Sequence, residues 1–389
     1  MNNLIITNCR IYQENKVIDN GFIEIREDKI YKVGVMGDFV SENKSTINAQ
    51  GLTAIPGFID GHIHGINGAD VMDATSEALD VMCKALPHEG TTSFLATTIT
   101  QSPEKIDVAL KNIARFQNKR GQAEMIGVHL EGPFIAVEKA GAQPREYILE
   151  PNLEQFQKWQ SLANGYIKTI TMAPEHDQTG EFISYLYEKG VNVSAGHTSA
   201  THTDMKKAVE HGVRQVTHIC NACSGIHHRE IGVVGSALLM EELRSELIAD
   251  GVHVSPEMVE LIYKNVGSDR VILITDGMRA KCLSKGTYDL GGQNVTVSGD
   301  RAALRDGTLA GSILRMIDGV KNMFEFTEAT VRDVIRMASE NPAKQLGVFS
   351  GKGSLEVGKD ADIVLVSEDF TISHTICRGQ IAYQEGDQS

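Results

Sequence analysis

The chain has 389 residues, of which 41% are hydrophobic and 23% are charged, the composition of a folded protein too long for one ordinary domain. Its 51 acidic and 37 basic residues give a net charge of -14 at pH 7, and no long run of Lys and Arg offsets it. Because a field of this sign repels polyanions, we expect no nucleic-acid partner, and an anionic small substrate would need cations or backbone amides gathered locally at its site.

The first residues, Met1 to Arg10, have neither the basic start nor the long apolar core of a signal peptide. No later segment approaches the ~20 apolar residues of a membrane span. We therefore expect a cytoplasmic protein with no membrane partner. The six cysteines are scattered along the chain, which favours reduced thiols over a disulfide framework.

Both ends of the chain contain short apolar, β-branched runs bounded by polar turn residues. These runs are 4–12, 21–26 and 29–34 near the amino terminus, and 358–366 and 374–383 near the carboxyl terminus. Such runs are typical of β-strands. We expect 1–53 and 355–389 to pair into one small β-sandwich domain.

Between the ends, short apolar runs alternate with longer segments of helical period, the pattern of a parallel sheet with crossover helices. Eight such runs are 54–62, 92–98, 125–131, 168–174, 191–197, 213–218, 247–253 and 271–276, and helix candidates include 75–88, 103–118, 201–211 and 256–266. Eight repeats in roughly 300 residues predict an α/β fold in which 54–354 form a closed (β/α)8 barrel of the TIM type. An open, doubly wound sheet is the alternative, but the first strand-to-helix turn lacks the glycine-rich phosphate fingerprint.

Polar side chains fall at the ends of five of these runs. They are His62, His64, Glu131, His197, His218 and Asp276. Active sites of such barrels lie at the carboxyl ends of the strands, so we expect all six to converge in one pocket. Histidine nitrogens and carboxylate oxygens suit zinc, iron or manganese, and the set is large enough for two ions bridged by a carboxylate. Asp60 and His129 share faces with these groups, and we expect them to hold the ligands in place.

Other histidines and the paired cysteines have plainer interpretations. His88, His176 and His211 are expected to be surface or capping residues. Cys220 and Cys223 form a CxxC spacing, but no second such pair accompanies it, which disfavours a redox or zinc motif. Between them, Asn221 lies three residues after His218, on a loop beside the expected metal site.

Several motifs of the sequence resemble those of a known family. Pro56–Gly65 and the segment 358–366 resemble the amidohydrolase superfamily, whose members combine a metal-containing barrel with a β domain built from both termini. Further motifs over nearly the whole chain are similar to those of the N-acetylglucosamine-6-phosphate deacetylase family; they start at His129, Gly196, Thr217, His228, Asp250, Thr275 and Asp306.

The resemblance implies hydrolysis of the N-acetyl amide of N-acetyl-D-glucosamine 6-phosphate to glucosamine 6-phosphate and acetate, in amino-sugar catabolism and cell-wall sugar recycling. Glu131 matches the glutamate that this family has where the wider superfamily often bridges two metals with a modified lysine. Retention of His62 and His64 indicates the variety with two metal ions per subunit, which could be zinc, iron, manganese or cobalt.

The resemblance also implies contacts with a phosphorylated amino sugar. Asn221, Ala222 and His253 are expected to touch sugar or phosphate. The loop formed by Leu309, Ala310 and Gly311 is expected to close over the ligand. Arg229 is expected to bind phosphate from the neighbouring subunit, which implies a homodimer.

Two departures from the family pattern stand near these positions. Ala142 and Gln143 are expected to contact the substrate, but single-metal members usually have His where this chain has Gln143. Whether Gln143 or a second metal polarises the amide carbonyl is therefore open. Cys220 and Cys223 replace larger apolar residues, and we interpret both as packing substitutions.

Asp276, at the end of the last predicted strand, is the residue that we expect to act as the catalytic acid and base. It would take a proton from the attacking water and return it to the departing amine. Rival hypotheses are a deacetylase for another hexosamine phosphate, a cyclic-amide hydrolase, a non-enzymatic scaffold or a sugar-binding module. A scaffold would not need all six polar groups, and a sugar-binding module would not explain Asp276 beside a metal.

Overall fold

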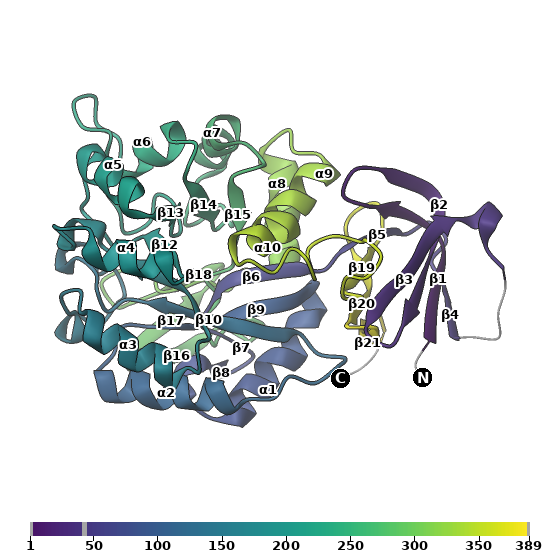
Figure 1. Ribbon diagram of the computed structural model, residues 1–389, viewed down its shortest axis with the longest axis horizontal. Helices are drawn as coiled ribbons and strands as arrows, with labels where there is room; N and C mark the ends of the chain where they lie inside the picture. The colour runs from purple at the N-terminus through teal and green to yellow at the C-terminus, as the bar shows by residue number, and fades with distance from the viewer. Residues whose placement is uncertain (1–2, 41–44, 387–389) are drawn as a thin grey trace.

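The structure is a computed structural model that describes residues 3–40 and 45–386 (Figure 1). A barrel occupies the left of this view, and a sheet made from both ends of the chain lies to its right. The two parts have separate apolar clusters, one inside and around the barrel and one under the terminal sheet. Among the described residues, no helix combines the length and apolarity needed to span a bilayer.

The barrel is an eight-stranded parallel sheet in which each strand pairs with the next along the chain. Its strands are β6 (Phe58–Ile63), β9 (Thr91–Thr98), β10 (Glu124–Glu131), β11 (Ile167–Met172), β12 (Asn192–Ala195), β13 (Val213–Val216), β14 (Arg244–Leu247) and β15 (Val271–Leu273). A parallel bridge between Ile63 and Gly277 joins the first strand to the segment after the last. The predicted TIM-type barrel is therefore confirmed.

Helices cover the outside of the barrel strands. They are α1 (Ser76–Ala85), α2 (Pro103–Arg115), α3 (Leu153–Leu162), α4 (Glu181–Glu188), α5 (His202–His211), α6 (Gly232–Leu239), α7 (Pro256–Val266) and α8 (Met316–Phe326), followed by α9 (Val331–Ile335) and α10 (Asn341–Gln345). Local chemistry fixes their starts. Thr201 and Asp204 form a reciprocal capping box at α5, and Ser255 caps α7 just before its first-turn proline.

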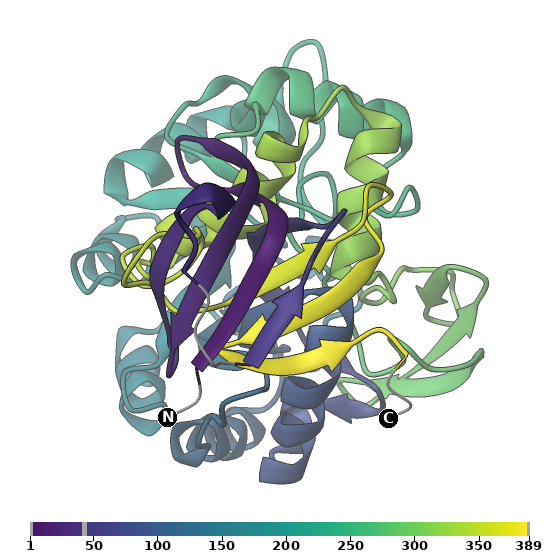
Figure 2. The same ribbon diagram turned by 90° about the vertical axis from the view of Figure 1, so that its right-hand side faces the viewer.

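The terminal sheet combines strands from the amino-terminal and carboxyl-terminal segments of the chain (Figure 2). Its order is β21 (Gln380–Gln384), β20 (Ile372–Cys377), β19 (Ile363–Val366), β5 (Thr53–Pro56), β1 (Asn3–Tyr12), β2 (Val17–Arg26) and β3 (Lys29–Val35), and β4 (Ser45–Asn48) also pairs with β1. β5 joins the halves because it pairs parallel to β1 and antiparallel to β19. The domain boundaries drawn from the sequence stay a prediction.

Two runs that were expected to be single strands are each two strands. The run 54–62 divides into β5 in the terminal sheet and β6 in the barrel, at Gly57. A Cβ at Gly57 would lie 2.2 Å from Oγ1 of Thr92, so only glycine lets the chain pass this close to β9. The run 374–383 divides into β20 and β21 at Arg378 and Gly379, whose positive φ angles of 47° and 78° form a two-residue hairpin turn.

The predicted position of the seventh barrel strand is wrong. The strand is Arg244–Leu247, and the expected run 247–253 is mostly the loop that follows it. Two of the four residues of β14, Arg244 and Glu246, are charged, so β14 is not an apolar run. Glu246 is instead 2% exposed, because its carboxylate accepts hydrogen bonds from other buried side chains inside the barrel.

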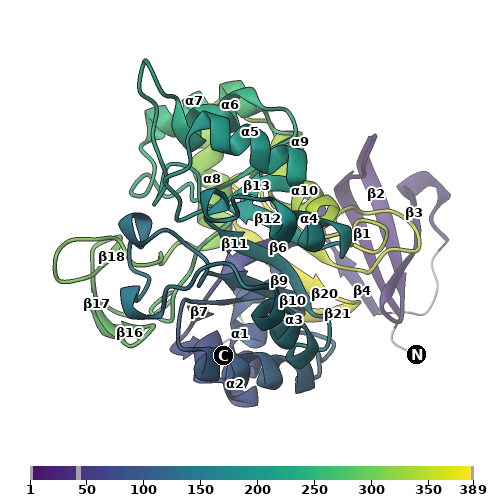
Figure 3. The ribbon, with the colours of Figure 1, turned by 60° about the vertical axis from the view of Figure 1, so that its left-hand side comes forward.

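A small antiparallel sheet between β15 and α8 was not anticipated. It consists of β16 (Gly286–Leu290), β17 (Gln293–Ser298) and β18 (Arg301–Ala303), and Figure 3 shows it at the left, beyond the ends of the barrel strands. Gln293 donates a hydrogen bond of 2.6 Å to the carbonyl of Ala142, and Gln101 donates one of 2.6 Å to the carbonyl of Gly291. This sheet is therefore tied to loops that follow β9 and β10.

Candidate metal centre and substrate cavity

The six polar groups predicted at strand ends lie together at one rim of the barrel. His62 lies within β6, Glu131 is the last residue of β10, and His64, His197, His218 and Asp276 lie one to three residues beyond their strands. His197, His218 and Asp276 have positive φ angles of 50°, 29° and 49°, a conformation uncommon for residues other than glycine. The chain therefore turns sharply at three of the six positions, as backbone at functional sites often does.

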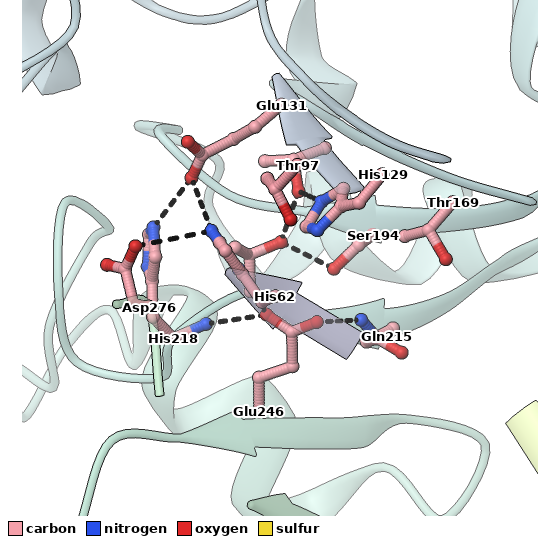
Figure 4. Close-up of polar contacts among 12 residues, drawn as sticks. His62, Thr97, His129, Glu131, Thr169, Ser194, Gln215, His218, Glu246 and Asp276 are labelled. Carbon is pink, nitrogen blue, oxygen red and sulfur yellow. Dashed lines mark hydrogen bonds and ion pairs between the residues drawn. The ribbon is translucent and has the colours of Figure 1, made fainter. Parts of the chain in front are cut away.

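Glu131 contacts all four histidines of the group, and Figure 4 shows it above His62 and His218. Its Oε1 is 3.3 Å from Nε2 of His62, 3.3 Å from Nε2 of His197 and 3.2 Å from Nε2 of His218. Its Oε2 is 3.3 Å from Nε2 of His64. One carboxylate thus contacts all four imidazoles, and the two rings of His197 and His218 approach each other with 3.2 Å between their Nε2 atoms.

Asp276 completes a second, overlapping set. Its Oδ1 is 3.2 Å from Nε2 of His64 and 3.5 Å from Nε2 of His62. Three triads of described residues have ligand atoms close enough to share an ion: His62 with His64 and Asp276, Glu131 with His197 and His218, and His62 with His129 and Glu246. The first two together contain the six predicted groups. Since Glu131 also contacts the histidines of the first triad, it is placed to serve both.

Hydrogen bonds on the far side of the rings fix their orientation. Nδ1 of His62 is 3.0 Å from Oε2 of Glu246, Nδ1 of His64 is 3.2 Å from the carbonyl of Thr97, and Nδ1 of His197 is 2.8 Å from the carbonyl of Lys139. Because a carbonyl or carboxylate oxygen only accepts, each Nδ1 is assigned as the donor. A neutral ring then presents an unprotonated Nε2, so buried lone pairs of nitrogen and oxygen face one another.

Such an arrangement fits a divalent cation. The separations of 3.2 to 3.5 Å between the facing atoms are close to the edge of about 3.3 Å expected for a tetrahedron of ligands 2.0–2.1 Å from a zinc-sized ion. Without a cation the lone pairs would repel unless protons were taken up, and Nε2 of His62 makes no hydrogen bond in the structure. The donor set and its spacing therefore suit a metal centre.

The electrostatics of the site point the same way. Burial alone would lower the pKa of His62, but Glu131, Asp276 and Glu246 raise it well above the ordinary value. Burial would likewise lower the pKa of His64, but hydrogen bonds to Asp276 and Glu131 raise it to about 10. Burial raises the pKa of Asp276, yet His62 and His64 bring it down to about 2. The site thus attracts positive charge strongly, and a metal ion satisfies that preference by replacing the protons.

Asp60 and His129, which were expected to hold the ligands in place, are both buried beside His62. Oδ1 of Asp60 accepts the backbone N–H of His62 at 3.2 Å and that of Thr275 at 3.3 Å, and its Oδ2 accepts the hydroxyl of Thr275 at 2.5 Å. The buried carboxylate of Asp60 therefore connects the ends of the two barrel strands that carry His62 and Asp276. Nε2 of His129 is 2.7 Å from the hydroxyl of Thr171.

Glu246 and its partner Gln215 were not predicted from the sequence to support the site. Nε2 of Gln215 donates a hydrogen bond of 2.5 Å to Oε1 of Glu246, and the other oxygen of Glu246 accepts from His62 (Figure 4). Both are buried on neighbouring strands, β13 and β14. Both are polar residues within barrel strands, and this position could have identified them. Glu246 was overlooked because the seventh strand was predicted to begin at residue 247, three residues too late.

A cavity of about 390 Å³ opens above the candidate metal centre. Seven of the nine residues predicted to contact substrate line it: Ala142, Gln143, Asn221, Ala222, His253, Leu309 and Gly311. Ala310 and Arg229 do not. Ala310 is fully buried in the core of the small sheet, where its N–H bonds the carbonyl of Ala302 at 3.0 Å, and Arg229 is exposed on the loop before α6.

Gln143 is fixed so that its amide nitrogen points at the metal centre. Its Oε1 accepts the backbone N–H of Thr100 at 2.8 Å, and its Nε2 donates to Oε2 of Glu131 at 2.6 Å. The side chain therefore orients Glu131 in addition to lining the cavity. His253 is oriented in a similar way, since its Nδ1 is 2.6 Å from Oδ2 of Asp250. Burial lowers the pKa of His253, but this carboxylate raises it above the ordinary value.

The cavity also has lining residues that the sequence did not single out. They include Ile99, Glu138, Lys139, Leu290 and Thr308. Leu290 ends β16 and Thr308 follows β18, so the small sheet forms one wall of the cavity. Isolated charged or apolar residues in loops carry no periodic signal, which is why the sequence alone did not identify them.

Comparison with known proteins places this site in a family. Residues 53–382 match the amidohydrolase family. An N-acetylglucosamine-6-phosphate deacetylase of Bacillus subtilis (strain 168) is 47% identical over 99% of both chains, and one of Lysinibacillus sphaericus is 41% identical over 98% of both. The crystal structure of the enzyme of that name from Pasteurella multocida, 32% identical, covers 97% of this chain and 99% of its own with a TM-score of 0.92. The chain therefore belongs to the amidohydrolase family and, within it, to the N-acetylglucosamine-6-phosphate deacetylases.

Proposed function

We propose that this chain hydrolyses the N-acetyl amide of N-acetyl-D-glucosamine 6-phosphate to glucosamine 6-phosphate and acetate, in amino-sugar catabolism and cell-wall sugar recycling. The observation that carries the proposal is the convergence of four imidazoles and two carboxylates at the base of one cavity. The activity named for full-length relatives supports it.

The proposed metal ligands are His62, His64, Glu131, His197, His218 and Asp276, which we assign to two ions per subunit. Imidazole and carboxylate ligands accept zinc, iron, manganese or cobalt, so cellular supply decides among them. When bound, such an ion lowers the pKa of water from ~16 toward ~7 and acts as a Lewis acid on the amide carbonyl.

Asp276 is the proposed catalytic acid and base. It lines the cavity, and its carboxylate lies beside His62 and His64, where the attacking water would be held. One carboxylate oxygen takes a proton from water as the new C–O bond forms at the carbonyl carbon. The same proton then passes to the amide nitrogen as the C–N bond breaks, so that glucosamine leaves as a neutral amine.

The remaining cavity residues would bind the sugar and its phosphate. Asn221, Ala222, His253, Leu309 and Gly311 line the cavity. We assign Arg229 to the phosphate bound in a neighbouring subunit of a homodimer. Its exposure on this chain and its absence from this chain's own cavity lining support that assignment.

The function is tested by measuring acetate release from a panel of N-acetyl amino sugars, with and without a 6-phosphate, by protein of measured metal content. We expect N-acetylglucosamine 6-phosphate to be the best substrate, and we expect chelation to abolish release and divalent metal to restore it. Failure of metal-loaded protein to release acetate from every compound would reject the proposal. Preference for the galactose epimer would keep the reaction and change the substrate.

The phosphate assignment is tested with Arg229→Ala. Loss of a charge-assisted hydrogen bond of about 1.5–3 kcal/mol predicts a KM for the phosphorylated sugar raised about 10- to 150-fold, with little change for the unphosphorylated sugar. Equal effects on the two sugars would count against a phosphate contact.

A further inference from the structure

Lys139 is the only Lys or Arg among the described residues that line the cavity. It ends the short 3-10 helix Val137–Lys139 on the loop after β10 and is half-buried. We propose that Lys139 is a phosphate ligand supplied by the same chain that holds the metal site. This inference rests on the proposed function and names a group that binds its substrate.

The position of Lys139 is set from two sides. Its carbonyl accepts the Nδ1 hydrogen bond of His197 at 2.8 Å, and its Nζ donates to the carbonyl of Cys223 at 3.1 Å. Two residues later, a Cβ built at Gly141 would lie 3.7 Å from the ring of His197 and 3.8 Å from Cβ of Ala222. The loop of Lys139 thus packs against both the metal centre and the segment proposed to hold phosphate.

The charges of the cavity leave a dianion few other partners in this chain. Glu131, Glu138 and Asp276 also line the cavity, and the whole chain carries a net charge of -14. Arg229 of the same chain does not line it. Besides the Arg229 assigned to the neighbouring subunit, a phosphate in this cavity would gain from a cation of the same chain, and Lys139 supplies one.

Phosphate would also be a better partner for Lys139 than the group that it now contacts. The carbonyl of Cys223 is a neutral acceptor, whereas a phosphate carries a negative charge and adds Coulomb attraction to the hydrogen bond of the ammonium. The four-carbon stem of lysine lets Nζ move from that carbonyl to a ligand in the cavity without moving the backbone that holds His197.

A competing explanation for the position of Lys139 is that Nζ only stabilises the Cys223 segment through its hydrogen bond to the Cys223 carbonyl. Lys139→Gln separates the two, because glutamine keeps an N–H donor for the carbonyl and loses the charge, whereas Lys139→Arg keeps the charge. Lys264→Gln is a matched control, since Lys264 is exposed on α7 and pairs with Glu260 at the surface.

The experiment compares kcat/KM for N-acetylglucosamine 6-phosphate and for N-acetylglucosamine in each variant, with metal content measured. We expect Lys139→Gln to lower the value for the phosphorylated sugar by about tenfold or more, and that for the unphosphorylated sugar by less than about twofold. Lys139→Arg should recover most of the loss, and Lys264→Gln should match the wild type. Glu138→Gln should act in the opposite direction on the phosphorylated sugar alone.

Equal losses on both sugars, or no loss, would overturn the proposal. Binding of inorganic phosphate, measured by calorimetry on metal-loaded protein, separates this inference from the proposed function. Phosphate binding weakened by Lys139→Gln supports the inference even if no acetate is released by the wild type. Unchanged phosphate binding in an active deacetylase rejects Lys139 as a ligand and leaves the proposed function standing.

Discussion

Four histidine nitrogens and two carboxylates face each other at the barrel rim. Each of three rings is turned into this position by a hydrogen bond on its other nitrogen, so the lone pairs point inward before any ion arrives. Ligands held in advance in this way lose little conformational freedom on binding, which favours tight metal affinity.

Asp276 lies in this group and is also the proposed proton carrier, so its amide variant separates the two roles. Asp276→Asn keeps the shape and one oxygen ligand but cannot accept a proton. We expect kcat to fall by about 10²- to 10⁴-fold with most of the metal retained. Steady-state kinetics on protein of measured metal content checks this, and near-normal turnover would refute the assignment.

The sequence predicted these six residues because strand ends can be recognised from apolar runs, and because parallel strands meet at one rim. It could not supply Lys139, whose position depends on how one irregular loop folds over β12. Sequence reasoning also could not tell which residues of a loop face the cavity. Ala310 was predicted to contact the ligand, but in the structure its side chain is buried.

At the scale of elements, neighbouring strands support one another through buried polar side chains. Gln215 on β13 bonds Glu246 on β14, and Glu246 bonds His62 on β6, so the contact crosses the interior of the barrel (Figure 4). The alternation of strands and helices was predicted correctly because it needs only local periodicity. The seventh strand and the small sheet β16 to β18 were not, because long-range partners decide whether charged or short segments form strands there.

Glu246→Gln tests this support of the metal centre. A neutral amide at position 246 is a weaker acceptor for Nδ1 of His62, so we expect affinity for the ion near His62 and His64 to fall about 10- to 100-fold. The ion held by His197 and His218 should be affected less. Metal analysis after dialysis against a weak chelator checks this, and equal loss from both sites, or from neither, would contradict it.

At the scale of the whole molecule, a buried ion cluster joins the terminal sheet to the base of the barrel. Nζ of Lys352 is 2.6 Å from Glu124 on β10, and it is 2.8 Å from both Asp360 and Asp362, which precede β19. The lysine side chain is only 7% exposed. The sequence showed that both termini form strands, but it gave no sign of this lysine, because a single charge in a loop has no pattern.

Lys352→Met would remove the cation that the described ion pairs give to Asp362, whereas Asp360 keeps Lys29 and Glu124 keeps Arg378. We expect the free energy of unfolding to fall by about 3–5 kcal/mol, whereas Lys264→Met, which removes a surface ion pair, should change it by less than about 1 kcal/mol. Urea titration followed by circular dichroism measures both. A small effect at position 352 would show that the cluster does not stabilise the fold.

The stability lost in Lys352→Met should depend on pH in a direction that follows from the pKa of Lys352. Burial would lower the pKa of Lys352, but Asp362, Glu124 and Asp360 raise it above the ordinary value. A raised pKa contributes stability that is fully present below the unfolded value of about 10.4, so the loss should persist from neutral pH to about 10. In mild acid the difference should shrink, because protonation removes the charge of the Asp362 carboxylate that the variant leaves unpaired.

The pairing of β5 with β19 has a consequence for how the polypeptide is made. Residues 53–56 leave the ribosome long before their partners 363–366, so one edge of β5 stays without its neighbour while the entire barrel sequence is being translated. An unpaired strand edge invites contact with other nascent chains. Chains released early, before residue 363, would keep that edge open, which makes premature termination a direct route to aggregation for this protein.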